Sequence, residues 1–284
     1  MTELEDKRLL ATGDNSGVDD VDYNAIICGY GEIRFVCFQT ATSAMLGAAA
    51  VSAGAVVLGY SSAPLLGPGV CIVAFLNYSA MAATRLRTVK ACRKMKRIST
   101  CNALKKEDDF VVTCLRYSDW LITMPMLAVE MLSLAQYKPM DGSAGDLPTW
   151  LQSDYMFAVV AITSFVMIAC GFVSLLAVGD FESCKHDTLK TGMIRWPLLA
   201  LGTVCLVVLY VILWMTAVYT KTPYLIEVIG FSGVWALYPV VFMMQTRVCV
   251  KIRTEHKDIA FAILDTISKA LFSVVISIMS GAMN

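Results

Sequence analysis

The sequence predicts an all-α membrane protein, folded as a bundle of seven transmembrane helices. Of its 284 residues, 57% are hydrophobic and 16% are charged, whereas a soluble domain is usually about half apolar and about a quarter charged. The apolar residues gather in long runs, each close to the ~20 residues that a helix needs to cross a bilayer. The equal numbers of basic and acidic residues, 23 of each, indicate no nucleic-acid partner.

Seven apolar runs give the order of the predicted helices. They cover roughly residues 32–59, 64–84, 110–136, 151–178, 195–219, 223–245 and 258–282. Pro64 and Pro68 mark the break between the first two runs, and Pro223 opens the sixth. The segment from Asp141 to Pro148 separates the third run from the fourth. Proline and glycine favour turns over continued helix, so these positions are the expected ends of helices.

The chain divides into a polar tail and one predicted domain. Residues 1–30 are polar and acidic, which is typical of a disordered tail. Residues 31–284 hold the seven runs, and we expect them to form a single seven-helix domain. Within it, residues 85–109 form a basic connector between the second and third runs.

Cysteine and histidine give no sign of a metal centre or an enzyme. The ten cysteines are scattered without a CxxC motif, so we expect small core residues rather than a disulfide framework. Both histidines, His186 and His256, lie in polar connectors. There is no nucleophile–base pair and no cofactor-binding loop, so we expect neither catalysis nor a bound metal.

A small set of charges lies inside the apolar runs. Asp265 and Lys269 are four residues apart in the seventh run, and Arg116, Asp119 and Glu130 lie in the third. A charged side chain at the centre of a transmembrane helix costs roughly 2.5–3.5 kcal/mol on insertion scales. Such residues therefore indicate a functional site, although a structural ion pair between helices is the alternative.

The spacing in the third run favours proton transfer. Asp119 and Glu130 are eleven residues apart, which is three helical turns and about 16 Å of rise, so both face the same way. Arg116 and Thr123 lie three residues before and four residues after Asp119, on the same face. Carboxylates along one face, with an amine on another helix, are typical of a proton relay. An interhelical polar clamp remains the other interpretation.

Four motifs resemble the microbial (type 1) rhodopsins, most closely the proteorhodopsin-like proton pumps. They are RYSDWLITMPMLAVE over residues 116–130, Phe75-Leu-Asn77-Tyr78, Trp235-Ala-Leu-Tyr238-Pro239, and Asp265-x-x-x-Lys269. The similarity extends over all seven runs. The fold that this resemblance implies is a seven-helix bundle with retinal in its core.

The resemblance implies a role for each intramembrane charge. Lys269 would carry all-trans retinal as a protonated Schiff base, with Asp119 and Asp265 as counterions. Asp119 would accept the proton and Glu130 would donate its replacement. The remaining residues would gate the exit, orient the acceptor, or line and tune the chromophore pocket: Arg116 as gate, Thr123 as orienting residue, and Trp120, Trp235, Tyr238, Pro239, Tyr78, Leu127 and Ser268 around retinal. A light-driven proton pump is the function implied.

Two positions depart from the family pattern. Asn77 stands where proteorhodopsins usually have a histidine that hydrogen-bonds the acceptor, so we expect a simpler titration of Asp119. Leu198 and Leu199 fill the region where relatives with a carotenoid antenna have a glycine, so we expect no antenna.

The basic residues lie almost entirely on one side of the predicted bundle. The side of the N-terminus carries Arg85, Arg87, Lys90, Arg93, Lys94, Lys96, Arg97, Lys105, Lys106, Lys185, Lys190, Arg195, Arg247, Lys251, Arg253 and Lys257. The opposite side carries Lys138 and Lys221. Lysine and arginine favour the cytoplasmic side of membrane proteins. We therefore expect a cytoplasmic N-terminus, opposite to the usual type 1 rhodopsin, and transport of protons into the cell.

Other functions fit the same motifs. A light-gated proton or cation channel can keep pump-like carboxylates, and a photosensor would signal through a separate partner. The partners that we expect in each case are the lipid bilayer, protons and further copies of the chain in a homo-oligomer.

Overall fold

The structure, a computed structural model, is helical and contains no strand throughout the residues that it describes. These are residues 23–57, 66–94, 98–136, 148–151, 153–176, 189–220, 224–245 and 254–282. The first six helices are α2 (Tyr23–Val57), α3 (Leu66–Lys94), α4 (Ile98–Gln136), α5 (Asp154–Leu176), α6 (Leu189–Thr220) and α7 (Tyr224–Gln245). A seventh rod joins α8 (Thr254–Asp265), the π-helix η1 (Thr266–Leu271) and α9 (Phe272–Ala282). The predicted seven-helix bundle is confirmed.

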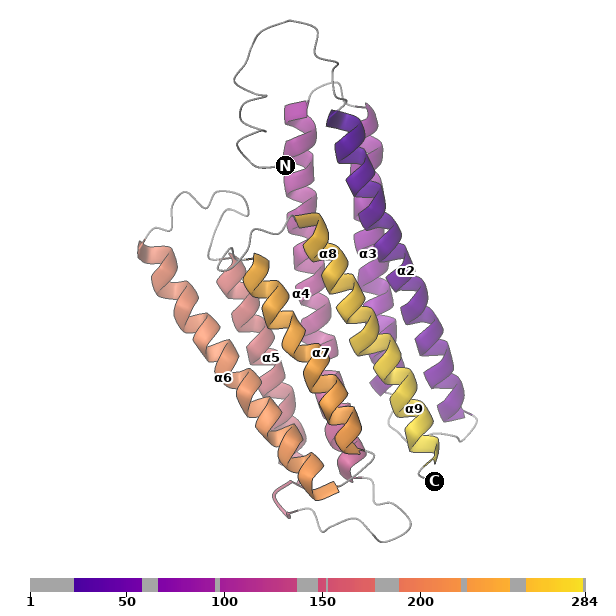
Figure 1. The fold of residues 1–284 in the computed structure, drawn as a ribbon, viewed down its shortest axis with the longest axis vertical. Helices are drawn as coiled ribbons and strands as arrows, with labels where there is room; N and C mark the ends of the chain where they lie inside the picture. Colours follow the sequence, from indigo (N-terminus) through magenta and orange to yellow (C-terminus); the bar gives the residue numbers. More distant parts are fainter. Residues whose placement is uncertain are drawn as a thin grey trace, which may run out of the picture.

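The helices pack side by side in chain order (Figure 1). α2 packs on α3, α3 on α4, α4 on α5, and α5 on α6, while α8, η1 and α9 lie between α2 and α7. At the upper end of Figure 1, α2, α3 and α4 extend beyond the other helices. The seventh rod therefore brings its side chains against both halves of the bundle.

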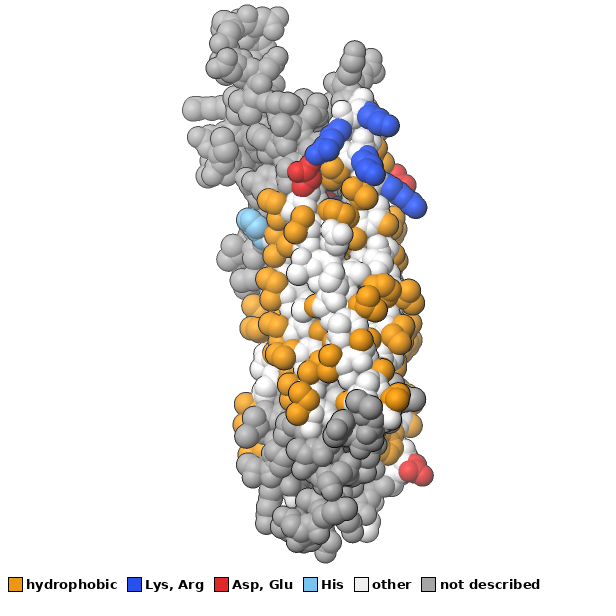
Figure 2. Space-filling view, turned by 90° about the vertical axis from the view of Figure 1, so that its right-hand side faces the viewer, with side chains coloured by type: hydrophobic (Ala, Val, Ile, Leu, Met, Phe, Trp, Pro, Cys, Tyr) orange, Lys and Arg blue, Asp and Glu red, His pale blue; other side chains and the backbone are white. Residues whose placement is uncertain are grey.

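The surface of the bundle suits a lipid bilayer. Within the described ranges, five stretches are long and apolar enough to cross a membrane: Gly31–Val57, Leu66–Lys94, Asp154–Leu176, Met193–Tyr219 and His256–Ile278. Large apolar side chains such as Val204, Val207 and Val211 on α6 are exposed, as lipid-facing residues are in a membrane helix. Figure 2 shows an apolar band below one end where lysine and arginine gather. The protein is a multi-pass integral membrane protein.

Helix extends into two regions that lie outside the seven predicted apolar runs. α2 begins at Tyr23, inside the tail expected over residues 1–30; residues 1–22 lie outside the described part. Most of the predicted connector over residues 85–109 is also helical, because α3 continues to Lys94 and α4 begins at Ile98. That segment contains no proline or glycine and is rich in lysine, arginine, alanine and leucine, which favour helix.

A disulfide joins these two helical extensions. Cys92 near the end of α3 is bonded to Cys101 near the start of α4. The expectation that the cysteines serve only as small core residues was wrong for this pair. Nine residues separate them, a spacing without a recognised motif, and only the close approach of the two helix ends reveals the bond.

Candidate functional site

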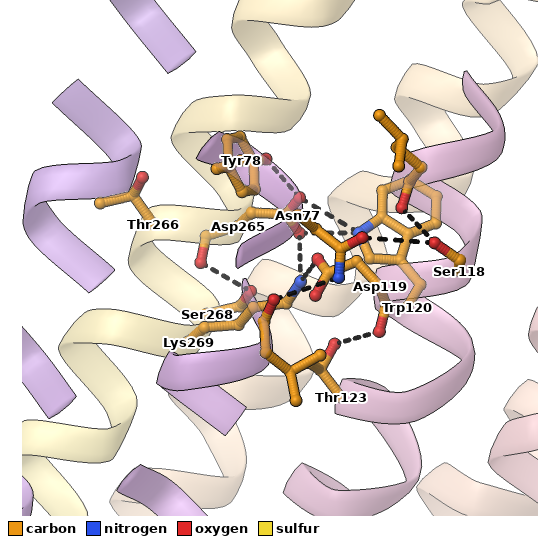
Figure 3. Close-up of polar contacts among 12 residues, drawn as sticks. Asn77, Tyr78, Ser118, Asp119, Trp120, Thr123, Asp265, Thr266, Ser268 and Lys269 are labelled. Atoms are coloured by element: carbon orange, nitrogen blue, oxygen red, sulfur yellow. Dashed lines mark hydrogen bonds and ion pairs between the residues drawn. The ribbon is translucent and has the colours of Figure 1, made fainter. Parts of the chain in front are cut away.

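Lys269 lies at the centre of the bundle on the π-helical turn. Its side chain is fully buried, and its Nζ forms an ion pair with Asp119 Oδ2 on α4. Asp265 Oδ1, one turn earlier on the same rod, lies 3.5 Å from the same nitrogen. Figure 3 shows the amine between the two carboxylates. A cation buried in this way is tolerable because two anions lie beside it.

Asp265 is held by three neutral donors. The indole Nε1 of Trp120 lies 2.9 Å from Asp265 Oδ1 and 3.1 Å from Oδ2. The hydroxyl of Tyr78 donates to Oδ2 at 2.5 Å, and that of Tyr238 donates to Oδ1 at 2.6 Å. Tyr238 also lies 2.8 Å from the hydroxyl of Ser268. These four side chains come from α3, α4, α7 and η1, so Asp265 fixes its helix against three others.

Asp119 is less completely bound than Asp265. Its Oδ2 faces Lys269, whereas its buried Oδ1 has no hydrogen-bond partner among the described residues. Thr123 Oγ1 donates to the backbone carbonyl of Asp119 at 2.9 Å. The hydrogen bond seen for Thr123 is thus to the backbone, whereas the resemblance implied that Thr123 orients the carboxylate.

Asn77 is turned to its own neighbours on α3 and α4. Its Nδ2 donates to the carbonyl of Val73 at 3.1 Å, and its Oδ1 accepts from Ser118 Oγ at 3.3 Å. Figure 3 places it beside the site, between α3 and α4. The hydrogen bonds of Asn77 in the described part of the chain therefore do not include the Asp119 carboxylate.

Arg116 is buried on α4, one turn before Asp119. Its Nη1 lies 2.9 Å from Asp258 Oδ1 on α8, and its guanidinium carbon lies 5.0 Å from the centre of the Phe261 ring. Its ion pair in the described structure is thus with Asp258 rather than with either carboxylate beside Lys269.

Asp258 belongs to a buried group of charges that the sequence analysis missed. We call it the arginine–aspartate cluster, and its members are Arg34, Arg85, Arg116, Asp108, Asp109 and Asp258. Arg34 lies 2.7 Å from Asp109 and 3.5 Å from Asp258. Arg85 lies 2.6 Å from Asp109 and 3.0 Å from Asp258, and it also pairs with Asp108. The cluster joins α2, α3, α4 and α8.

Only Arg116 was identified from the sequence, as the gate. Arg85, Asp108 and Asp109 were counted in the basic connector, and Arg34 and Asp258 lie at the starts of the first and seventh apolar runs, where charges are common. One signal was available, since Asp258 precedes Lys269 by eleven residues, the same three-turn spacing that singled out Asp119 and Glu130. Arg85, which was counted among the connector charges, is only 2% exposed.

Glu130 is buried near the opposite end of α4. Its carboxyl group lies against Gly67 in the first turn of α3, and its side chain is 1% exposed. It is three turns from Asp119 along the same helix. The structure thus places the three site carboxyl groups in two locations, with Asp119 and Asp265 at Lys269 and Glu130 apart from them.

Several aromatic side chains pack against one another in the core of the bundle. The Trp120 and Tyr238 rings pack edge to face with their centres 5.3 Å apart, and the ring centres of Phe231 and Trp235 are 4.2 Å apart. Leu127 is fully buried and Pro239 is half-buried. The indole Nε1 of Trp235 is buried with no hydrogen-bond partner among the described residues. Trp235 and Leu127 thus lie in the apolar core of the bundle, and Trp120, Tyr78, Tyr238 and Ser268 are linked to Lys269 through Asp265 and its hydrogen bonds.

The family follows from residues 35–282, which match the family described as "Bacteriorhodopsin-like protein". The chain belongs to this family. No curated protein sequence matches it. Its fold resembles the crystal structure of xanthorhodopsin, described as a light-driven ion pump with dual chromophore, at 16% identity and a TM-score of 0.64, covering 89% of this chain and 94% of that one.

Two further solved structures share the fold. The rhodopsin of Exiguobacterium sibiricum is 15% identical with a TM-score of 0.63, over 88% of this chain and 96% of that one. A blue-light-absorbing proteorhodopsin from Med12 is 16% identical with a TM-score of 0.50, over 87% of this chain and 96% of that one. At such identities the likeness establishes the microbial-rhodopsin fold.

Proposed function

We propose that this protein is a retinal-binding, light-driven proton pump. The observation that supports it best is Lys269, fully buried and paired with Asp119 and Asp265. A third buried carboxyl group, Glu130, lies three turns further along α4. A proton held at Lys269 Nζ then has an acceptor in contact with it and a separate donor to replace it.

The pocket around Lys269 suits retinal. Trp120, Trp235 and Tyr238 supply ring faces, and the unpartnered Trp235 Nε1 indicates surroundings poor in polar groups. Tyr78, Leu127 and Ser268 complete the lining, and Pro239 interrupts the hydrogen bonding of α7 beside it. When bound to Lys269, retinal would supply light absorption and a light-driven change in proton affinity at Nζ.

The chain's own residues supply the proton steps. Asp119 Oδ2 accepts the proton from Lys269 Nζ, since the two atoms are paired and Asp119 Oδ1 has no hydrogen-bond partner in the part of the chain that the structure describes. Asp265 accepts hydrogen bonds from Tyr78, Trp120 and Tyr238 and serves as the second counterion. Glu130 then returns a proton to Nζ. Arg116 gates the exit through its pair with Asp258, and Thr123 steadies the backbone at Asp119.

Photocurrents test this function directly. A pump moves protons in the light without a gradient, so its current keeps one sign under voltage clamp. A light-gated channel gives a current that reverses with voltage, and a photosensor gives none. Replacing Lys269 by alanine should remove the visible pigment and the current together. A reversing current in the native protein would overturn the proposal.

The direction of transport depends on which side holds the basic residues. We propose that the N-terminal side is cytoplasmic, because lysine and arginine gather at that end (Figure 2). Some of the basic residues counted in the sequence lie outside the described residues: Lys96, Arg97, Lys185, Arg247, Lys251, Arg253, Lys138 and Lys221. With this orientation, transfer from Lys269 toward Asp119 carries protons inward. Light should then make a lightly buffered cell suspension more alkaline.

Outward pumping is the second candidate, and the disulfide favours it. Cys92 and Cys101 lie at the same end as the basic residues, and disulfides persist mainly in oxidising compartments outside the cytosol. Acidification of the suspension would establish this orientation and overturn the inward one. A membrane-impermeant thiol reagent, applied to intact cells after reduction, labels these cysteines only if that end is external.

We also propose that the protein works without a carotenoid antenna. Leu198 and Leu199 on α6 are half-buried rather than open, and Gly202 packs against α5, where a β-carbon would lie 3.4 Å from Cys170 Cβ. Adding a carotenoid to the purified pigment should therefore leave the action spectrum of transport unchanged. A second band at the carotenoid's own absorption would contradict this.

A further inference from the structure

The start of α3 is closely fitted to the carboxyl group of Glu130. Gly67 lies in the first turn of α3 and is buried. A β-carbon at this position would lie 2.7 Å from Glu130 Oε1 and 3.5 Å from its Cδ and Oε2. The first distance is shorter than the closest approach of a carbon atom and an oxygen atom that are not bonded to each other. Any other residue at position 67 would therefore push the Glu130 carboxyl group away.

Polar groups lead from this contact toward Lys269. The carbonyl of Gly67 accepts a hydrogen bond from Ser273 Oγ at 3.4 Å. One turn along α3, the buried thiol of Cys71 donates to the backbone carbonyl of Lys269 at 3.7 Å. Ser273 and Cys71 therefore link the start of α3 to the rod that carries Lys269. We call Gly67, Cys71, Ser273 and Glu130 the donor pocket.

The described residues around the donor pocket are buried and mostly apolar. Ser52 on α2 donates to the carbonyl of Ser273 at 3.2 Å, and Met45, Ala48 and Ala74 are buried nearby against Cys71. The Glu130 carboxyl group is thus held in a closely packed part of the bundle. Small displacements of the group that carries the proton are costly, because transfer requires close and aligned donor and acceptor atoms.

We propose that Gly67 is the residue that selects glutamate as proton donor and sets the position of its carboxyl group. This rests on the proposed pump function. By lacking a β-carbon, Gly67 leaves room for the longer glutamate side chain to reach the α3 backbone. From there, Ser273 and Cys71 bridge the distance to Lys269. A residue with a side chain at position 67 suits aspartate at position 130, which is one methylene shorter.

The test adds a methyl group at position 67 and removes a methylene group at position 130, separately and together. The variants are Gly67→Ala, Glu130→Asp and the double variant, and the readout is the rate at which the visible band recovers after a laser flash. Each single variant should slow recovery by about ten- to a hundredfold, because the carboxyl group is either displaced or too short. The double variant should recover faster than both. The absorption maximum should stay unchanged, because none of these residues faces Lys269 Nζ.

The pH dependence separates positioning from general damage. In the native protein recovery should be nearly independent of pH near neutrality, because the proton comes from Glu130. In Gly67→Ala the rate should rise as pH falls, because protons then come from bulk water. Gly69→Ala is the matched control, since its β-carbon would meet only the flexible Met126 Cε at 3.0 Å. This control should recover like the native protein.

Two failures are distinguishable. If Glu130→Gln slows recovery but Gly67→Ala does not, Glu130 is the donor and the role of Gly67 is overturned. If Glu130→Gln itself recovers at the native rate, the proposed donor is wrong and the inference falls with it. If Gly67→Ala yields no pigment, the comparison of Glu130→Asp with the double variant still decides: equal rates overturn the inference.

Discussion

The two carboxylates beside Lys269 differ in how their oxygens are used. Asp265 accepts hydrogen bonds from Tyr78, Trp120 and Tyr238, whereas Asp119 keeps one oxygen without a partner in the described structure. Protonating Asp265 would cost it charge-assisted hydrogen bonds, which are about twice as strong as neutral ones. This difference supports the proposal that Asp119, rather than Asp265, is the proton acceptor.

This difference predicts distinct effects of two amide substitutions. Asp119→Asn should abolish light-driven transport while keeping a coloured pigment. Asp265→Asn should weaken the pigment itself, because four helices meet at that carboxylate, and the thermal bleaching rate should rise at least about tenfold. Bleaching and photocurrent measured on both variants check this. Transport that survives in Asp119→Asn would contradict the assignment of the acceptor.

Asn77 predicts the shape of the acceptor's titration. Its hydrogen bonds go to Val73 and Ser118, and an amide does not titrate. The visible band should therefore shift in a single step with pH, at a midpoint below about pH 7. Asn77→His should add a second step near the ordinary histidine range, about pH 6.5. An absorption titration of both proteins decides, and a two-step curve in the native protein would refute the prediction.

At the scale of elements, the disulfide fastens the extended ends of α3 and α4. Closing a loop of this length stabilises a fold by about 2–3 kcal/mol. Cys92→Ser should therefore lower the temperature of thermal bleaching and leave the colour of the pigment unchanged, since the bond is remote from Lys269. Cys114→Ser, at a half-buried free cysteine, is the control. A change of colour in Cys92→Ser would show that the two regions are coupled.

The spans were predictable because an apolar run of membrane length leaves few alternatives in a bilayer. The ends of α3 and α4 were not, because lysine and arginine suit a solvated helix and a basic loop equally well. Within the site, Lys269, Asp119 and Asp265 were identifiable because a charge in an apolar run is exceptional. Asp258 and Arg85 lie where charges are common, so only the folded structure distinguishes them.

At the scale of the whole molecule, the arginine–aspartate cluster ties four helices together. Removing one partner of a buried ion pair leaves the other uncompensated and costs about 3–5 kcal/mol. Asp258→Asn should therefore destabilise the protein strongly, because three arginines pair with this carboxylate. The exposed Asp154 on α5 is the control, and Asp154→Asn should cost no more than about 1 kcal/mol. Thermal unfolding in detergent measures both.

The cluster also divides the molecule mechanically. All the ion pairs described above join α2, α3, α4 and the rod of α8 and η1, and none involves α5, α6 or α7. Packed apolar surfaces slide past one another more readily than paired charges separate. Strain released at Lys269 should therefore be relieved on the side of α5 and α6, since Tyr238 on α7 is hydrogen-bonded to Asp265. Spin labels on α6 should move relative to α3 in the light, while labels on α2 and α3 should keep their spacing. The helices joined by ion pairs would then stay fixed while α6 moves against them.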